Sequence, residues 1–453
     1  MAVTGTSRWR GWRGSRGGSP APRSPAHRRY MLGMLVDATG SGMYLPVSLL
    51  YFHHVTGLPM TQVGAFMTLA ALVGLVCTPV TGILVDRFGA RAVVVTGYVV
   101  RAVGFAAYPL VDDGGQLLLV ATLVALGDRS FPAAIQSLIA DIAQGTGRDR
   151  LIAVQRSLRN AGLGAGGLLA GAVLGIGSDL AYHSLVLGNG AALLLAAGLL
   201  GSLPGTRGRS DAGPGAERAQ AKRPGGYRDV LRDRPFVLLT AVNIPIAFGY
   251  MVLAVVLPVY VTQVLQASAS WPGVLFAVNT VLVAGAQVPV TRLLARHRRT
   301  RSAALGGAVL SLSFVFFALL GAAPDSGVLI VGVFVATVLF TLGELLHGAT
   351  ASALATEAAP ERLRGRYLAF YQFSWSVPAT AAPALFTALI AFSPTAMWLL
   401  LATCAGLAAL ALVRLERRLP DAAVRPRGPE PEPEPEPEPA QPTPLTTKEG
   451  TPQ

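Results

Sequence analysis

An all-α membrane protein with many spans is the fold class that the sequence predicts, and composition and charge placement carry this prediction. Apolar residues make up 52% of the 453 residues and charged residues only 13%, about half the charged share of an ordinary soluble domain. The mean hydropathy is +0.51. The formal net charge is +13, but the charges lie in short clusters between apolar runs. This pattern argues against a continuous basic face for nucleic acid.

Twelve apolar stretches are each long enough to cross a bilayer, whose hydrocarbon core of about 30 Å takes about 20 helical residues. They fall into two sets of six, separated by a hydrophilic linker at 204–234. The stretches are 30–52, 61–84, 92–111, 115–140, 151–176 and 181–203, then 235–262, 271–295, 302–322, 327–356, 366–391 and 394–413. The sequence therefore predicts two pseudo-symmetric six-helix bundles, 30–203 and 235–417.

The placement of Lys and Arg predicts the orientation in the membrane. Connections after the odd-numbered stretches contain neither residue, whereas the alternate connections contain DRFGAR, GTGRDR, RHRRTR and ERLRGR. Basic residues stay on the cytoplasmic side, so we expect a plasma-membrane protein with both termini in the cytoplasm. Residues 1–29 and the Pro/Glu-rich 418–453 should form disordered cytoplasmic tails. A start codon assigned too far upstream is the alternative explanation of residues 1–29.

The two halves of the chain also repeat. GDRSFPAAIQSLIADIAQGTGRDR at 127–150 aligns without a gap with GELLHGATASALATEAAPERLRGR at 343–366, so Asp128 corresponds to Glu344. Chance alignment of Ala- and Gly-rich helices would not match the charges as well. Repeated halves are typical of transporters, in which the substrate path lies between the halves near mid-membrane.

A short charged segment, GILVDRFGAR, connects the second and third stretches. With Gly82, Asp86, Arg87, Gly89 and Arg91 it resembles the G-x-x-x-D-R-x-G-x-R signature of the major facilitator superfamily. Together with the span count and the repeat, the resemblance covers roughly residues 30–417. It implies a transporter that works by alternating access, nearest to the twelve-helix drug-efflux-like exporters. A solvated loop that only fixes the topology is the alternative explanation of the segment.

The resemblance also implies a conformational latch at this segment. Asp86 would bind the N-terminus of the eleventh helix, near 365–367, where free N–H groups and the helix dipole attract an anion. Arg91 would pair with Asp141 at the end of the fourth helix. The two glycines would permit close helix packing and the reversal between two helices. These contacts would hold the halves together while the cytoplasmic side is closed.

Two further signatures of the family are incomplete. Leu123 stands where many relatives carry an Arg four residues before the glycine that Gly127 matches. The glycine-rich stretch 160–171 lacks the Gly-Pro of many antiporters, although its glycines favour close helix packing. Both departures count against proton antiport without excluding it.

Polar and charged residues within the apolar stretches are the candidates for a proton and substrate cavity. A charge at the bilayer centre costs roughly 2.5–3.5 kcal/mol on insertion scales, so such residues usually face a cavity or a partner. The candidates are Asp37, Tyr44, Arg101, Asp128, Arg129, Asn243, Glu344 and Tyr371. Helical spacing also places Asp37, Ser41, Tyr44 and Ser48 on one polar stripe.

The roles of these candidates remain open at this point. We expect Asp37 and Glu344 to bind protons or a cationic substrate. Asp128 could instead be half of a structural ion pair with Arg129 or Arg101. For the uncharged polar residues, hydrogen bonds between helices are an equally good explanation.

These observations predict a secondary active transporter that exports small amphipathic or cationic compounds in exchange for protons. We expect a monomer without a cofactor or metal, whose partners are the substrate, protons and the bilayer. An importer with the same fold is the alternative, and a non-transporting sensor is a remote one. Catalysis is not expected: ELLH at 344–347 resembles half of a di-iron site, but its repeat counterpart is DRSF. No nucleotide-binding G-x-x-x-x-G-K-[ST] occurs either.

Overall fold

The computed structural model describes residues 25–142, 146–176, 178–203, 227–321 and 326–425, and within these ranges it contains helices and no strand. The first long helices are α1 (Pro25–Tyr44), α3 (Met60–Phe88), α4 (Ala90–Ala107), α5 (Gly114–Ile142), α6 (Thr146–Leu174) and α7 (Asp179–Gly201). The others are α10 (Arg234–Val255), α12 (Trp271–Leu294), α13 (Arg299–Leu320), α14 (Ser326–Ala358), α15 (Arg364–Phe392) and α16 (Pro394–Leu415). The predicted all-α class is confirmed.

Short helices fill the ends of the bundle. They are η1 (Leu45–Val47), α2 (Ser48–Thr56), η2 (Tyr108–Leu110), α9 (Tyr227–Arg232), α11 (Leu257–Val259), η3 (Tyr260–Val264), η4 (Glu361–Leu363), η5 (Glu416–Arg418) and α17 (Asp421–Val424). Several begin or continue where a proline interrupts a long helix. Pro46 and Pro258, for example, occur in the matching LPV segments that follow α1 and α10, and proline cannot supply the N–H that an uninterrupted helix needs.

Ten helices in the part of the chain that the structure describes are long and apolar enough to cross a membrane. The long helices α1 and α6 are not among them. Charged residues lower their hydropathy, including Asp37 in α1 and Arg156 and Arg159 in α6. The multi-span class is therefore established, whereas the number twelve remains a prediction.

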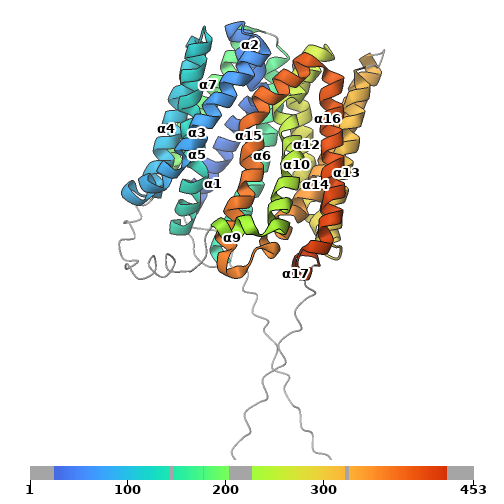
Figure 1. Ribbon diagram of the computed structural model, residues 1–453. Helices are drawn as coiled ribbons and strands as arrows, with labels where there is room; N and C mark the ends of the chain where they lie inside the picture. The colour runs from blue at the N-terminus through green and yellow to red at the C-terminus, as the bar shows by residue number, and fades with distance from the viewer. Residues whose placement is uncertain (1–24, 143–145, 177, 204–226, 322–325, 426–453) are drawn as a thin grey trace, which may run out of the picture.

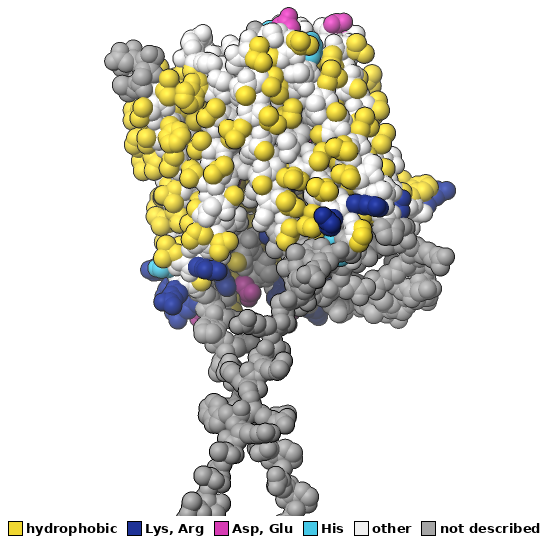
Figure 2. Space-filling model, turned by 180° about the vertical axis from the view of Figure 1, so that it is seen from behind, with side chains coloured by type: hydrophobic (Ala, Val, Ile, Leu, Met, Phe, Trp, Pro, Cys, Tyr) yellow, Lys and Arg dark blue, Asp and Glu magenta, His cyan; other side chains and the backbone are white. Residues whose placement is uncertain are grey.

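The long helices lie side by side and roughly parallel (Figure 1). The helices from α1 to α7 lie mainly on one side and those from α10 to α16 on the other. Hydrophobic side chains cover the flanks of the bundle, and Lys and Arg gather at one end (Figure 2). Leu119, Leu180 and Phe392 are 73%, 76% and 85% exposed. Apolar exposure on this scale is typical of a surface that contacts lipid.

The end that carries Arg87, Arg91, Arg298 and Arg366 is called the Arg-rich end below. The reversal between α3 and α4 lies there, at Gly89, whose φ of +81° is unfavourable for residues with a side chain. Gly82 has open space where a Cβ would stand. Gly82 therefore mediates no close helix approach in this conformation, in contrast to the expectation from the sequence.

Contacts between the two sets of helices lie far from the Arg-rich end. In the first turn of α12, Gly273 packs so closely on Gly167 and Gly171 of α6 that a Cβ would overlap their backbone atoms. In the last third of α15, the N–H of Ala384 donates to the Thr68 hydroxyl of α3 at 3.0 Å. The bundle is thus sealed at the end opposite to its arginines.

Gly273→Ala tests this close approach. We expect the added methyl group to push α6 and α12 apart and to lower the free energy of unfolding by roughly 1–3 kcal/mol, as overpacking does. Thermal unfolding in detergent micelles measures the change. Gly285 lies on the same helix with open space at its Cβ position, so Gly285→Ala controls for the gain in helix propensity. Equal melting temperatures for the two variants would contradict the close packing.

Candidate functional site

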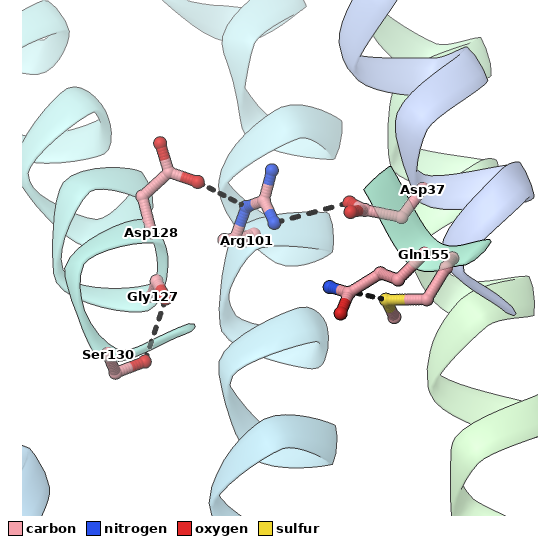
Figure 3. Close-up of polar contacts among 7 residues, drawn as sticks. Asp37, Arg101, Gly127, Asp128, Ser130 and Gln155 are labelled. Atoms are coloured by element: carbon pink, nitrogen blue, oxygen red, sulfur yellow. Dashed lines mark hydrogen bonds and ion pairs between the residues drawn. The ribbon is translucent and has the colours of Figure 1, made fainter. Parts of the chain in front are cut away.

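Arg101 of α4 lies between two carboxylates that come from two other helices (Figure 3). Its Nη1 is 3.5 Å from Oδ1 of Asp37 on α1, and its Nε is 3.0 Å from Oδ1 of Asp128 on α5. The guanidinium carbon also lies 5.8 Å from the centre of the Tyr98 ring, within the range of a cation–π contact. Gly127 makes room for this arrangement, since a Cβ there would overlap the Arg101 side chain.

The three charged groups differ in exposure. The side chains of Asp37 and Arg101 are 5% and 8% exposed, whereas that of Asp128 is 59% exposed. With two carboxylates and one guanidinium, the cluster has a formal charge of −2 + 1 = −1 when both acids are ionised. The structure also resolves an alternative that the sequence left open. Asp128 pairs with Arg101, while Arg129 donates to the Thr380 hydroxyl of α15 at 2.9 Å.

A cavity of about 450 Å³ lies beside this cluster. It brings together four of the residues predicted for a cavity, namely Asp37, Tyr44, Arg101 and Asp128. Arg159 of α6 and Asn189 of α7 also line it. Sequence reasoning did not select these two, although both are polar residues within apolar stretches.

The predicted polar stripe on the first helix is shorter than expected. Asp37, Ser41 and Tyr44 line the cavity. Ser48 does not, and its hydroxyl donates to the Leu45 carbonyl at 3.2 Å. The interruption at η1 separates Ser48 from the helical spacing that placed it on the stripe.

Glu344 of α14 belongs to a second polar cluster. Its Oε2 accepts a hydrogen bond of 2.8 Å from the Asn279 amide of α12, which also reaches the Thr341 hydroxyl at 3.0 Å. The Tyr250 hydroxyl of α10 donates to the backbone carbonyl of Glu344 at 2.7 Å. Glu344 is half-buried and has no basic partner within the described ranges. It differs in this from Asp128, its counterpart in the repeat.

A buried network continues from the next turn of α14. The Nε2 atom of His347 lies 3.0 Å from Oδ1 of Asn243, and its Nδ1 lies 3.3 Å from the Ala303 carbonyl. The Asn243 amide donates to the Ser374 hydroxyl at 2.8 Å, which donates to the Tyr371 carbonyl at 2.7 Å. Asn243 and Tyr371 therefore lie in a network that joins helices, away from the Asp37 cavity. The sequence offered hydrogen bonds between helices as one explanation of Asn243 and Tyr371, but it did not predict His347 as their partner.

The charged segment of the signature makes few contacts in this conformation. Asp86 is exposed. Its carboxylate forms no hydrogen bond or ion pair with any residue that the structure describes. Gly365, near the start of α15, is open as well, because no atom lies within 4 Å of a Cβ built there, whereas Tyr367 already donates to the Asp233 carboxylate at 3.1 Å. The latch therefore remains a prediction for another conformation.

The two arginines of the signature have local partners. Arg91 donates to the Gly201 carbonyl at the end of α7, where free carbonyl groups accept such bonds. Arg87 lies over the Phe88 ring, with its guanidinium carbon 5.3 Å from the ring centre. The side chain of Asp141, the predicted partner of Arg91, lies outside the described residues.

Residues 30–383 and 247–449 match the family model described as the Major Facilitator Superfamily. The chain belongs to this superfamily. It is 27% identical over 354 residues to the multidrug resistance protein MdtH of Aeromonas hydrophila, covering 76% of this chain and 83% of that protein. It is 25% identical over 350 residues to MdtH of Yersinia enterocolitica, covering 75% and 80%. Membership of the superfamily confirms the predicted transporter class and the expectation that the protein is not an enzyme.

Solved structures show the same superfamily fold. The nucleoside transporter NupG matches with a TM-score of 0.70 and 9% identity, over 86% of this chain and 99% of that chain. A bacterial homologue of the human lysosomal transporter Spinster, in an inward-facing and occupied conformation, matches with a TM-score of 0.67 and 14% identity. That match covers 87% of this chain and 97% of the homologue.

Arg101→Gln tests the structural part of the charged cluster. Removing the cation leaves the buried Asp37 without its ion-pair partner, and breaking a buried ion pair in this way costs roughly 3–5 kcal/mol. We expect a large fall in melting temperature in detergent micelles, partly restored by adding Asp37→Asn. Arg129→Gln, which loses a bond to a neutral hydroxyl, should cost less. A melting temperature of Arg101→Gln equal to that of the wild type would show that the cluster does not stabilise the bundle.

Proposed function

We propose that this superfamily member exports small amphipathic or cationic compounds across the plasma membrane in exchange for protons. The observation that carries the proposal is Glu344, a half-buried carboxylate in a membrane helix without a basic partner in the described ranges. Intramembrane carboxylates of this kind serve in proton relays and ion paths. The name of the MdtH relatives, multidrug resistance protein, supports export.

Substrate and proton would use different groups. The Asp37–Arg101–Asp128 cluster carries a formal charge of −1 and presents Asp128 to the cavity, so it would attract the cationic group of a substrate. Glu344 would take up a proton from outside and release it to the cytoplasm. The proton gradient then drives the exchange, because the proton is taken up on one side of the membrane and released on the other.

The orientation follows from the arginines. The Arg-rich end would face the cytoplasm, together with both termini. Gly273 and the bond between Thr68 and Ala384 seal the opposite end. The conformation would therefore be the one that loads substrate from the cytoplasm, and the Asp86 latch would form when the protein opens outward.

Glu344→Gln tests the proton site, because the amide keeps the shape of the side chain and cannot titrate. Everted vesicles that contain wild-type protein should accumulate a lipophilic cation, and an uncoupler should abolish accumulation. We expect Glu344→Gln to lose at least about nine-tenths of the gradient-driven accumulation and to keep exchange of labelled for unlabelled substrate. Glu357→Gln, on the same helix near the Arg-rich end, should accumulate normally.

Three results would reject parts of this proposal. Accumulation that ignores the uncoupler in wild-type vesicles removes proton coupling. Normal gradient-driven accumulation by Glu344→Gln removes this residue as the proton site. Uptake into right-side-out cells, with none into everted vesicles, favours an importer of a small polar solute.

Asp86→Asn tests the latch. Loss of the charge should weaken the outward-open conformation and leave more molecules open to the cytoplasm. We expect faster maleimide labelling of a cysteine at Ala369, near the start of α15, in a background without Cys77 and Cys404. Substrate affinity should stay within about twofold of the wild type. Unchanged labelling with a loss of substrate affinity would assign Asp86 to binding instead.

A further inference from the structure

The cavity beside the Asp37–Arg101–Asp128 cluster is also lined by a second cation, which forms no ion pair with the described residues. Arg159 of α6 lines the same cavity as Asp128 and is exposed. In the part of the chain that the structure describes, its guanidinium makes no hydrogen bond or ion pair, although its charge attracts that of the buried Asp37 at longer range. Asp128 contacts Arg101 through one oxygen and keeps most of its carboxylate accessible. One cavity thus offers separate positive and negative groups to a ligand.

An unsatisfied amide lies on the wall of this cavity. Asn189 of α7 is 1% exposed, and neither its Nδ2 nor its Oδ1 has a hydrogen-bond partner among the residues that the structure describes. Gly40 of α1 leaves the room that the amide occupies, since a Cβ there would overlap Oδ1. A buried polar group without a partner costs about 1–3 kcal/mol. A ligand that carries both a donor and an acceptor would remove this cost.

Three aromatic rings, together with aliphatic side chains, form much of the remaining cavity wall. The rings of Tyr44 and Phe105 meet edge to face, with centres 4.7 Å apart, and Phe131 of α5 also lines the cavity. Aromatic side chains supply large apolar contact area with specific geometry. A volume of about 450 Å³ lies within the usual range for small-molecule sites, so an aromatic ring system fits.

We infer that this cavity selects zwitterionic aromatic compounds, with the cationic group at Asp128, the anionic group at Arg159 and a polar group at Asn189. A simple cation would make no use of the exposed Arg159 guanidinium, and a simple anion would lie in the same cavity as the exposed carboxylate of Asp128, which repels it. The inference rests on the proposed function and narrows its substrate class. A zwitterion still carries the cationic group that the cluster attracts.

Two fluorescent dyes separate the charge classes. Rhodamine 110 has a free carboxylate and is zwitterionic at neutral pH, whereas rhodamine 123 is its methyl ester and a cation. Fluorescence anisotropy with the purified full-length protein in detergent measures both affinities. We expect the wild type to bind rhodamine 110 about tenfold more tightly than rhodamine 123, the ratio that corresponds to about 1.4 kcal/mol.

Variants locate the preference on single side chains. Arg159→Gln should weaken binding of rhodamine 110 about tenfold and should not weaken binding of rhodamine 123, from which it removes a like charge, so that the preference disappears. Arg156→Gln, on an exposed residue one turn earlier on the same helix and outside the cavity lining, should keep the preference. Asn189→Ala should weaken both dyes about equally.

The outcomes separate this inference from the proposed function. Equal wild-type affinities, or a tenfold preference that survives in Arg159→Gln, would overturn the inference. Proton-dependent accumulation of rhodamine 123 in everted vesicles, without any preference for rhodamine 110, would also reject the inference and leave the proposed function standing. A third outcome is a preference for rhodamine 110 that is lost in Arg159→Gln, without proton-dependent movement of either dye. This outcome would support the inference and reject proton-driven export.

Discussion

Burial of the Arg101 guanidinium is the constraint on which the first half of this transporter depends. A charge inside a membrane protein is tolerated when a counter-charge or a cavity accepts it, and here both are present. Asp37 and Asp128 approach Arg101 from two other helices, so one cation fixes the positions of α1, α4 and α5. The same contacts give the neighbouring cavity its negative wall, because Asp128 is the exposed end of the cluster. In the proposed function, the same three side chains would serve both stability and substrate binding.

The two halves use related positions for different purposes. Asp128 and Glu344 correspond in the repeat, yet Asp128 contacts a guanidinium and Glu344 contacts the neutral Asn279 amide. The first half therefore holds carboxylates that are paired with a cation, and this cation opposes their protonation. The second half holds a carboxylate without a neighbouring cation, so protonation of Glu344 meets no such opposition. His347 and Asn243 tie α14 to α10 and α13 just below this carboxylate. A change at Glu344 would thus occur next to a rigid junction of three helices.

Close packing at one end of the bundle complements these charged sites. Gly167, Gly171 and Gly273 bring α6 and α12 into backbone contact, which side chains of any size would prevent. At the Arg-rich end, Asp86 has no partner among the described side chains, and Gly365 near the start of α15 has open space at its Cβ position. In an alternating-access protein the two ends exchange these roles. Arg159 lies on α6, about two turns from this glycine seam, so movement of α6 would also move the cationic wall of the cavity.

The sequence by itself determined the all-helical membrane class, the repeat and most of the charged candidates, because hydropathy, spacing and matched motifs are local properties. It left open whether Asp128 pairs with Arg101 or with its neighbour Arg129. Adjacent residues on a helix point about 100° apart, so the choice depends on which helix packs on each face, and only the tertiary structure placed α4 on one side and α15 on the other. The same packing separated Asn243 and Tyr371 from the Asp37 cavity and added Arg159 and Asn189 to it. Contacts between segments that are distant in the sequence decide whether a polar residue lines a cavity or packs against a neighbouring helix. A local sequence pattern carries no information about these contacts.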